Sequence, residues 1–191
     1  IRQLTNTCGI AAVCYIWLNE DPVGYVKAAI QLYYSGYLPG FTTSIEDITD
    51  LKQWAPTANP SDYPSESGPV DLVMQGSLRF VENTPNRMSD SGWDGFTWPS
   101  EVINLTNLFA GLNSEPFASD DKILSSIDSK YIEGSRIIIL TGTLNSSWHY
   151  IVYKGEYSSE SNTFLKWDYG KAKTEDASGF EDKIQGVYIF R

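Results

Sequence analysis

The stretch from Cys8 to Leu18 is the feature that most restricts how this chain can fold. Its residues, CGIAAVCYIWL, include no charged side chain and are apolar on every side of a helix. Such a helix has to be surrounded by other parts of the protein. It is also much shorter than the roughly 20 apolar residues that cross a bilayer. The stretch therefore predicts a central helix buried inside a globular domain, and no membrane insertion.

The size and charge of the chain indicate which classes of binding partner to expect. At 191 residues it is long enough for one domain with a substantial core. It carries 24 acidic against 14 basic residues, a net charge of −10. Surfaces that bind nucleic acid or anionic lipid need clustered Lys and Arg. We therefore expect neither nucleic acid nor a membrane surface as a partner.

Apolar spacing of three and four residues predicts further helices in the first part of the chain. One begins at Pro22 and ends at Gly36, with Val23, Val26, Ala29, Ile30 and Tyr33 at helical spacing. The neighbouring Tyr34 and Tyr37, like Tyr33, are expected to make core and lobe contacts rather than to form a ligand platform. Other helices are expected at 44–54, at 69–81, from a Ser100 cap to 112, and from a cap at Ser119 or Asp120 to 132, with loops over 55–67 and 83–99.

The pattern changes to short β-branched and aromatic runs near residue 133. Strands are expected at 135–141, 148–153, 163–167 and 186–190, with a hairpin around Gly155 and 158–162. Four such strands make an antiparallel sheet. The fold class is therefore α+β, with a helical part over about 1–132 and a sheet part over about 133–191.

The two cysteines have different expected roles. Six residues apart in one helix, their Cα atoms lie ~9 Å apart, too far for a disulfide, so both are expected to be free thiols. Cys8 begins the helix, where the positive end of the macrodipole and unpaired N–H groups favour a thiolate. Cys14 lies mid-helix among apolar residues and is expected to act as a small hydrophobe. Cys8 is thus the candidate nucleophile.

The single histidine, His149, limits the possible chemistry. No spacing of Cys8, Cys14 and His149 suits a zinc site, and no phosphate-binding loop is present, so no metal and no cofactor is expected. Asp168 follows His149 by 19 residues across the predicted hairpin, which allows the two to lie side by side. An imidazole oriented by a carboxylate can take a proton from a thiol. Gln3 can aim its amide at the same space and join the backbone N–H of Cys8 as an oxyanion hole.

These residues resemble the papain-like cysteine peptidase superfamily. The resemblance rests on Gln3 and Cys8-Gly9 at the head of a buried helix, on WHYIVY around His149 and on LKWDYG around Asp168. It implies one papain-like domain over 1–191, with a helical lobe followed by an antiparallel sheet lobe. It further implies a peptidase that hydrolyses a peptide or isopeptide bond through a thioester. Cys8 would be the nucleophile, His149 the base, Asp168 the residue that orients it and Gln3 the oxyanion donor.

Compact bacterial members with an aspartate as third residue, such as the leader peptidases of bacteriocin exporters and related effector proteases, are the most similar. The sequence departs from papain in two places. Gln3 and Cys8 are five residues apart, one fewer than is usual there, and papain's aromatic residue just after its cysteine is missing. The substrate preferences of papain therefore do not transfer, and the role of Gln3 is the least supported.

Three other functions remain open at this point. Glutamine deamidation or transglutamination would use the same thioester and release ammonia, and fold analogy does not separate it from proteolysis. Cell-wall amidases of the NlpC type commonly use a second histidine, which this chain lacks. A papain-like domain kept only to bind a peptide is disfavoured by the presence of Cys8, His149 and Asp168 together.

The resemblance implies a protein or peptide as substrate and favours a secreted or exported bacterial protein. The chain opens with Ile-Arg-Gln and has no charged region followed by an apolar stretch and a small-residue cleavage site. This start is expected of a trimmed or mature form.

Overall fold

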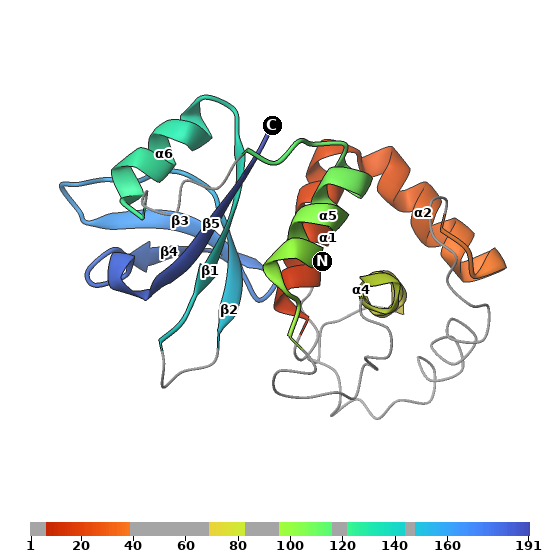
Figure 1. The fold of residues 1–191 in the computed structure, drawn as a ribbon. Coiled ribbons are helices and arrows are strands. Elements are labelled where there is room, and N and C mark those ends of the chain that lie inside the picture. Colours follow the sequence, from red (N-terminus) through yellow and green to blue (C-terminus); the bar gives the residue numbers. More distant parts are fainter. Residues whose placement is uncertain (1–6, 39–68, 83–95, 116–121, 144–147) are drawn as a thin grey trace. The chain divides into compact units, whose positions relative to one another are not determined.

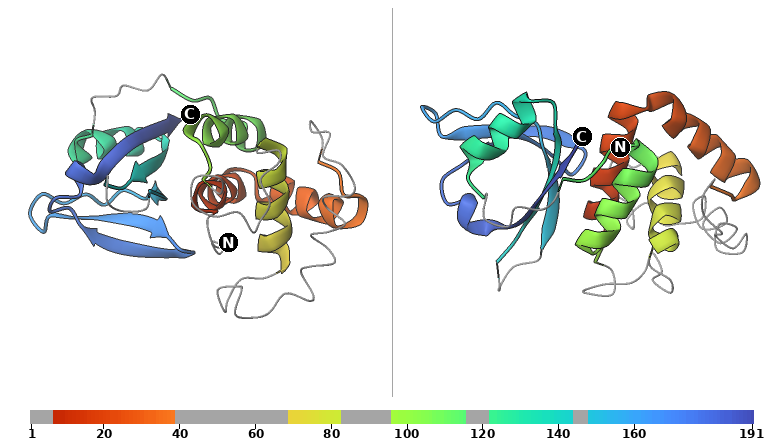
Figure 2. Two further views of the ribbon diagram at one scale, coloured as in Figure 1. Left: turned by 60° about the horizontal axis from the view of Figure 1, so that its bottom comes forward. Right: turned by 45° about the horizontal axis from the view of Figure 1, so that its top comes forward.

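The computed structural model describes residues 7–38, 69–82, 96–115, 122–143 and 148–191. The chain divides into two compact units, residues 1–110 and 111–191. The described part of unit 1 is helical, and that of unit 2 contains one α-helix and a sheet (Figures 1 and 2). The α+β fold class is confirmed. The expected helix at 44–54 and the loop at 55–67 lie outside the described residues, as does most of the loop at 83–99.

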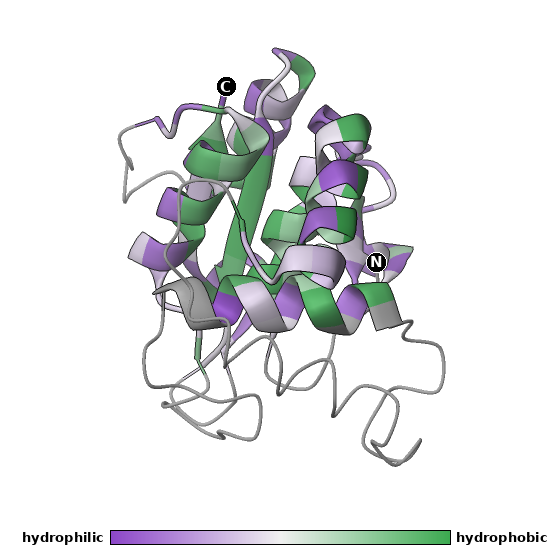
Figure 3. Ribbon diagram, turned by 90° about the vertical axis from the view of Figure 1, so that its right-hand side faces the viewer, coloured by the Kyte–Doolittle hydropathy of each residue, from purple (hydrophilic) through white to green (hydrophobic). Residues whose placement is uncertain are grey.

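Unit 1 contains four described helices, α1 (Cys8–Glu20), α2 (Pro22–Ser35), α4 (Pro69–Glu82) and α5 (Pro99–Ala110). The buried helix α1 contacts the other three, and its segment from Cys8 to Cys14 is entirely buried. The prediction of a central buried helix is therefore confirmed. Figure 3 shows hydrophobic and hydrophilic residues interspersed along the helices that face the viewer, as expected of elements with one buried side.

Local signals determine where the helices begin and end. The carboxylate of Asp21 accepts a hydrogen bond from the N–H of Gly24 at 2.8 Å and caps α2. Gly36 ends α2 in a left-handed conformation, with φ of 69°. The predicted cap at Ser100 was wrong, because α5 begins one residue earlier with Pro99. There Glu101 reaches back and accepts from the N–H of Trp98 at 2.6 Å.

The apolar residues whose spacing predicted α2 do not form its buried side. The buried residues of this helix are Tyr25, Ala28 and Leu32, whereas four of the five residues at the predicted spacing are exposed and Ala29 is half-buried. The tyrosines expected to make core and lobe contacts are exposed as well, with Tyr34 at 79%. A second apolar stripe thus runs along the outer face of α2. Helical spacing alone does not say which of two apolar stripes the core covers.

Unit 2 is built on a five-stranded antiparallel sheet in the order β4-β3-β2-β1-β5. The strands are β1 (Arg136–Thr141), β2 (His149–Tyr153), β3 (Thr163–Asp168), β4 (Lys171–Asp176) and β5 (Ile184–Phe190), preceded by helix α6 (Leu124–Ile132) and interrupted by a short 3-10 turn, η2 (Glu181–Lys183). The four expected strands are present. The fifth, β4, was missed because nearly all its residues are exposed and show no apolar alternation.

Helix α6 belongs to the sheet unit. Its buried residues Leu124 and Ile127 pack in one core cluster with Ile137, Ile139, Tyr153, Phe164 and other strand residues. The expected boundary between helical and sheet parts near residue 132 therefore differs from the observed division after residue 110. The helix also begins at Leu124, later than either predicted cap, and Glu181 accepts from its first N–H at 2.7 Å. Ser119 and Asp120 lie outside the described residues.

Candidate active site

Cys8 is the first residue of α1, as the sequence predicted. The preceding residue, Thr7, does not cap the helix with its side chain, since its hydroxyl donates to Oε1 of Gln75 in α4 at 2.7 Å. No acidic residue lies in the first turn either. The N-terminal end of α1 therefore keeps its positive character next to the Cys8 side chain.

Gly9 lets α1 approach the start of α5 closely. A Cβ at this position would lie 2.8 Å from the Cβ of Thr97 and 3.1 Å from Cγ2 of Val102. A larger residue would force the two segments apart, which typically costs 1–3 kcal/mol. The glycine after the candidate nucleophile thus has a packing role that positions the head of α1.

Cys14 is a packing residue, as predicted. Its side chain is fully buried and both cysteines are free thiols. Burial raises the pKa of the Cys14 thiol to about 12, although an interaction with Tyr25 acts in the opposite direction. Cys14 is therefore protonated and hidden over the ordinary pH range.

His149 and Asp168 lie side by side in unit 2. His149 is the first residue of β2 and Asp168 the last of β3, and the two strands are antiparallel neighbours. Nε2 of His149 is 2.6 Å from Oδ1 of Asp168. The imidazole is 18% exposed and the carboxylate 7%. The hairpin that the sequence predicted thus places the carboxylate against the ring.

The ionisation of Asp168 determines which imidazole nitrogen can act as a base. Burial alone would raise the pKa of this carboxyl, but the hydrogen bonds and charges of His149 and Lys166 outweigh it and lower the pKa to about 2. An ionised carboxylate only accepts hydrogen bonds, so Nε2 of His149 must carry the proton that it donates. In the neutral ring Nδ1 is then the acceptor. This is the tautomer that a general base needs.

Three side chains that the sequence analysis did not identify surround the pair. Lys166, on β3, has Nζ 3.0 Å from Oδ2 of Asp168, and Lys173, on β4, has Nζ 3.7 Å from the same oxygen. The ring of Tyr169 stacks on His149 at 4.7 Å between centroids and 13° between planes. Period-two alternation along β3 could have placed Lys166 beside Asp168, but Lys173 depends on the unpredicted β4.

Tyr169 reaches this position through an unusual backbone conformation. Its φ is +48°, in the left-handed region, and Gly170 follows at +82°. The turn between β3 and β4 therefore bends back, so that the tyrosine ring covers one face of the imidazole. Lys173 lies 5.3 Å from the centroid of the Tyr169 ring. Stacking on Tyr169 restricts tilting of the imidazole ring out of its plane.

The lowered pKa of Asp168 predicts an acid-dependent loss of stability. Because its folded-state pKa lies below the ordinary 3.8, ionised Asp168 stabilises the fold by roughly 2 kcal/mol at neutral pH. This contribution decreases as the pH falls through the interval from about 4 to about 2. Urea unfolding should therefore show a deficit in Asp168→Asn at pH 6 that is roughly halved at pH 3. The exposed Asp182→Asn is the matched control, and an equal deficit at both pH values would contradict the assignment.

The predicted site residues fall into different parts of the chain. His149 and Asp168 are brought together, while Cys8 belongs to unit 1 and its pairing with His149 remains a prediction. Gln3 lies outside the described residues, so its role as oxyanion donor also remains a prediction.

Within the described ranges, no cluster of three or more His, Cys, Asp or Glu could hold a metal ion. No described helix is long and apolar enough to span a membrane.

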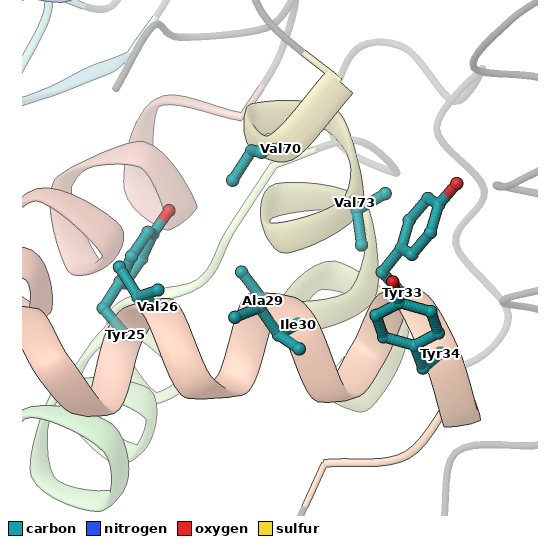
Figure 4. A pocket seen from close by; sticks show the side chains of 8 residues that line it. All are labelled: Tyr25, Val26, Ala29, Ile30, Tyr33, Tyr34, Val70 and Val73. Carbon is teal, nitrogen blue, oxygen red and sulfur yellow. The ribbon is translucent and has the colours of Figure 1, made fainter.

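Unit 1 also contains an apolar pocket of about 420 Å³ between α2 and α4 (Figure 4). Tyr25, Val26, Ala29, Ile30, Tyr33 and Tyr34 line it from α2, and Val70 and Val73 from α4. These side chains include no carboxylate, thiol or imidazole. The described lining of the pocket suits an apolar group and offers no residue for acyl transfer.

No protein-family model, curated protein or solved structure matches this chain. A function for it can therefore be inferred only from its own residues and their geometry.

Proposed function

We propose that this protein is a cysteine peptidase with a papain-like fold, which hydrolyses a peptide or isopeptide bond through a thioester at Cys8. The arrangement of its elements supports the proposal. A buried helix begins with a cysteine, an antiparallel sheet follows in the chain, and the single histidine begins one of its strands. Because both lobes of a papain-like enzyme contribute to the site, the proposal requires Cys8 and His149 to meet.

The hydrogen bond between His149 and Asp168 is the observation that carries the proposal. A histidine kept only for packing has no need of a buried, ionised carboxylate on Nε2. In the proposed reaction the carboxylate holds the ring with Nδ1 directed at the nucleophile. It also stabilises the imidazolium that forms when the ring takes up a proton.

The reaction proceeds in two stages. The proton of the Cys8 thiol moves to Nδ1 of His149, and the sulfur forms a bond to the carbonyl carbon of the substrate. The C–N bond then breaks, and the leaving amine takes the proton from the imidazolium. In the second stage water attacks the carbonyl carbon of the thioester and its proton moves to His149. The C–S bond then breaks, the acid product leaves, and the imidazolium returns the proton to the sulfur of Cys8. The backbone N–H of Cys8, with Gln3, would stabilise the oxyanion in both stages.

Selective alkylation tests the proposed pair without knowledge of the substrate. Near pH 6, iodoacetamide should add one carbamidomethyl group to the folded protein, and peptide mass mapping should locate it at Cys8. The buried Cys14 is the internal control, because its thiol stays protonated and inaccessible. In His149→Ala the rate at pH 6 should fall at least tenfold and be largely regained near pH 9.

Two results would contradict the proposal. Equal labelling of both cysteines in the folded protein would show that Cys8 is not selectively activated. A rate unchanged in His149→Ala would show that the imidazole does not act on Cys8.

If the pair is confirmed, a library of thiol-directed peptide warheads, read by intact mass, identifies the preferred side chains. Ammonia release from glutamine peptides without chain cleavage would instead favour a deamidase with the same residues.

A further inference from the structure

We propose that Lys166 is a positioning residue of this site, which acts through Asp168 and, with Glu175, sets the pH at which His149 becomes a base. The catalytic meaning of this inference rests on the proposed function. The effect itself is a property of the imidazole and can be measured whether or not the protein is a peptidase.

The two oxygens of Asp168 have different partners. Oδ1 faces Nε2 of His149 at 2.6 Å, while Oδ2 faces Nζ of Lys166 at 3.0 Å. Rotation of the carboxylate would break both contacts at once. Nζ of Lys166 is in turn 3.1 Å from Oε2 of Glu175. A chain of alternating charges therefore runs from Glu175 through Lys166 and Asp168 to the imidazole.

Sheet stability alone does not account for this arrangement. Lys166 and Lys173 are direct partners in the register of β3 and β4, and like charges placed opposite each other destabilise a sheet. The Lys166 side chain is also only 11% exposed, and burying an ammonium costs free energy unless it is paired. Burial lowers the pKa of Lys166, but its contacts with Asp168 and Glu175 outweigh it, and the net shift is upward. Lys166 thus stays charged beside Asp168.

A shared carboxylate interacts less strongly with the imidazolium than an unshared one. The Lys166 ammonium offsets part of the negative charge that Asp168 presents to His149, so the ring loses its proton at a lower pH. Glu175 acts in the opposite direction, because it offsets part of the Lys166 charge. Its side chain is 39% exposed, so solvent screens its effect.

Few other described groups of unit 2 lie around His149. Lys173 adds a second, more exposed ammonium 3.7 Å from Oδ2 of Asp168, and Tyr169 covers the ring face. On the neighbouring strand β1 the register partner is Thr141, an uncharged residue whose hydroxyl donates to the backbone carbonyl of His149. Lys166 is therefore the closest buried cation that reaches the ring through Asp168.

The single histidine makes the test direct. Because the chain has one imidazole, its NMR resonances report on His149 without further assignment. The titration midpoint is measured in a Cys8→Ala background at about 0.15 M ionic strength, so that no thiol titrates with the ring. Lys166→Met should raise the midpoint by about one pH unit, a tenfold increase in proton affinity. Lys166→Arg should restore the parent value, since it returns the charge.

Two further variants separate this effect from general charge removal. Lys171→Met removes an exposed lysine from the same hairpin and should shift the midpoint by less than about 0.3 units. Glu175→Gln should lower the midpoint, by less than Lys166→Met raises it. An unchanged or lowered midpoint in Lys166→Met would overturn the proposal. If Lys166→Met does not fold, as judged by circular dichroism, an unchanged or raised midpoint in Glu175→Gln would overturn it.

The same measurement keeps the two proposals apart. If Cys8 pairs with His149, the imidazole midpoint must differ between the wild type and Cys8→Ala. If that difference is absent, the proposed peptidase site fails, while the Lys166 shift is still tested within the Cys8→Ala series. If it is present and Lys166→Met shows no shift, only the role of Lys166 fails.

Discussion

Replacing Cys8 by alanine should abolish turnover of any substrate found with the warhead library, because every covalent step passes through this sulfur. The loss should reach the detection limit, since the second thiol of the chain, Cys14, is fully buried. Stability should change little, by about 1 kcal/mol, because only one sulfur atom is removed. Activity is measured as kcat/KM and stability by urea unfolding.

Cys14→Ala is the matched control for this experiment. It removes the same atom from the same helix, but at a fully buried position that packs with Tyr25. This variant should lose at least as much stability as Cys8→Ala and keep its turnover. Activity that survives in Cys8→Ala would refute the peptidase and the deamidase alike, because both need the thioester.

His149→Ala should lower kcat/KM by a factor of roughly 10² to 10⁴, the usual contribution of a general base. Asp168→Asn should have a smaller effect. The single amide oxygen can accept from Nε2 of His149 or from Nζ of Lys166 but not from both, so the ring is held less firmly and the charge that stabilises the imidazolium is lost, while the base itself remains. Both variants are measured with the same substrate over pH 5 to 9.

The double variant shows whether these residues act as a unit. If Asp168 works only through His149, adding Asp168→Asn to His149→Ala should cost nothing further. Independent, multiplicative losses would mean that Asp168 has another task. Wild-type kcat/KM in Asp168→Asn would mean that its charge is not needed, and that the carboxylate serves only to keep Lys166 and Lys173 in place.

Much of the secondary structure could be predicted from local patterns. The apolar helix, the Pro22 and Gly36 boundaries of α2 and the β-branched strands were all recognisable, because propensity and capping depend on residues close in sequence. Strand β4 was not, because an edge strand exposed to solvent needs no apolar face. The buried side of α2 could not be predicted from its spacing, because either of its two apolar stripes satisfies the spacing rule.

In the candidate site, too, some features could be predicted from the sequence and others could not. Cys8 at a helix start and His149 across a hairpin from Asp168 follow from order along the chain and from strand geometry. The protonation states of the site do not follow from the sequence in this way. The choice of Nε2 as donor depends on which ring nitrogen faces Oδ1 of Asp168. The pKa of Asp168 is lowered by His149 together with Lys166, and the part of Lys166 appears only when β3 is paired and its charge is buried.

By itself the sequence determined the α+β class, the buried helix headed by Cys8, and the two thiols as unbridged, because these depend on polarity, length and spacing within single elements. Only the tertiary structure placed α6 with the sheet, added β4 beside β3, and brought Lys166 and Lys173 to Asp168. Pairing partners and burial are set by contacts between elements distant in sequence. Charges gain their effect on a neighbour's proton only where such contacts exclude water.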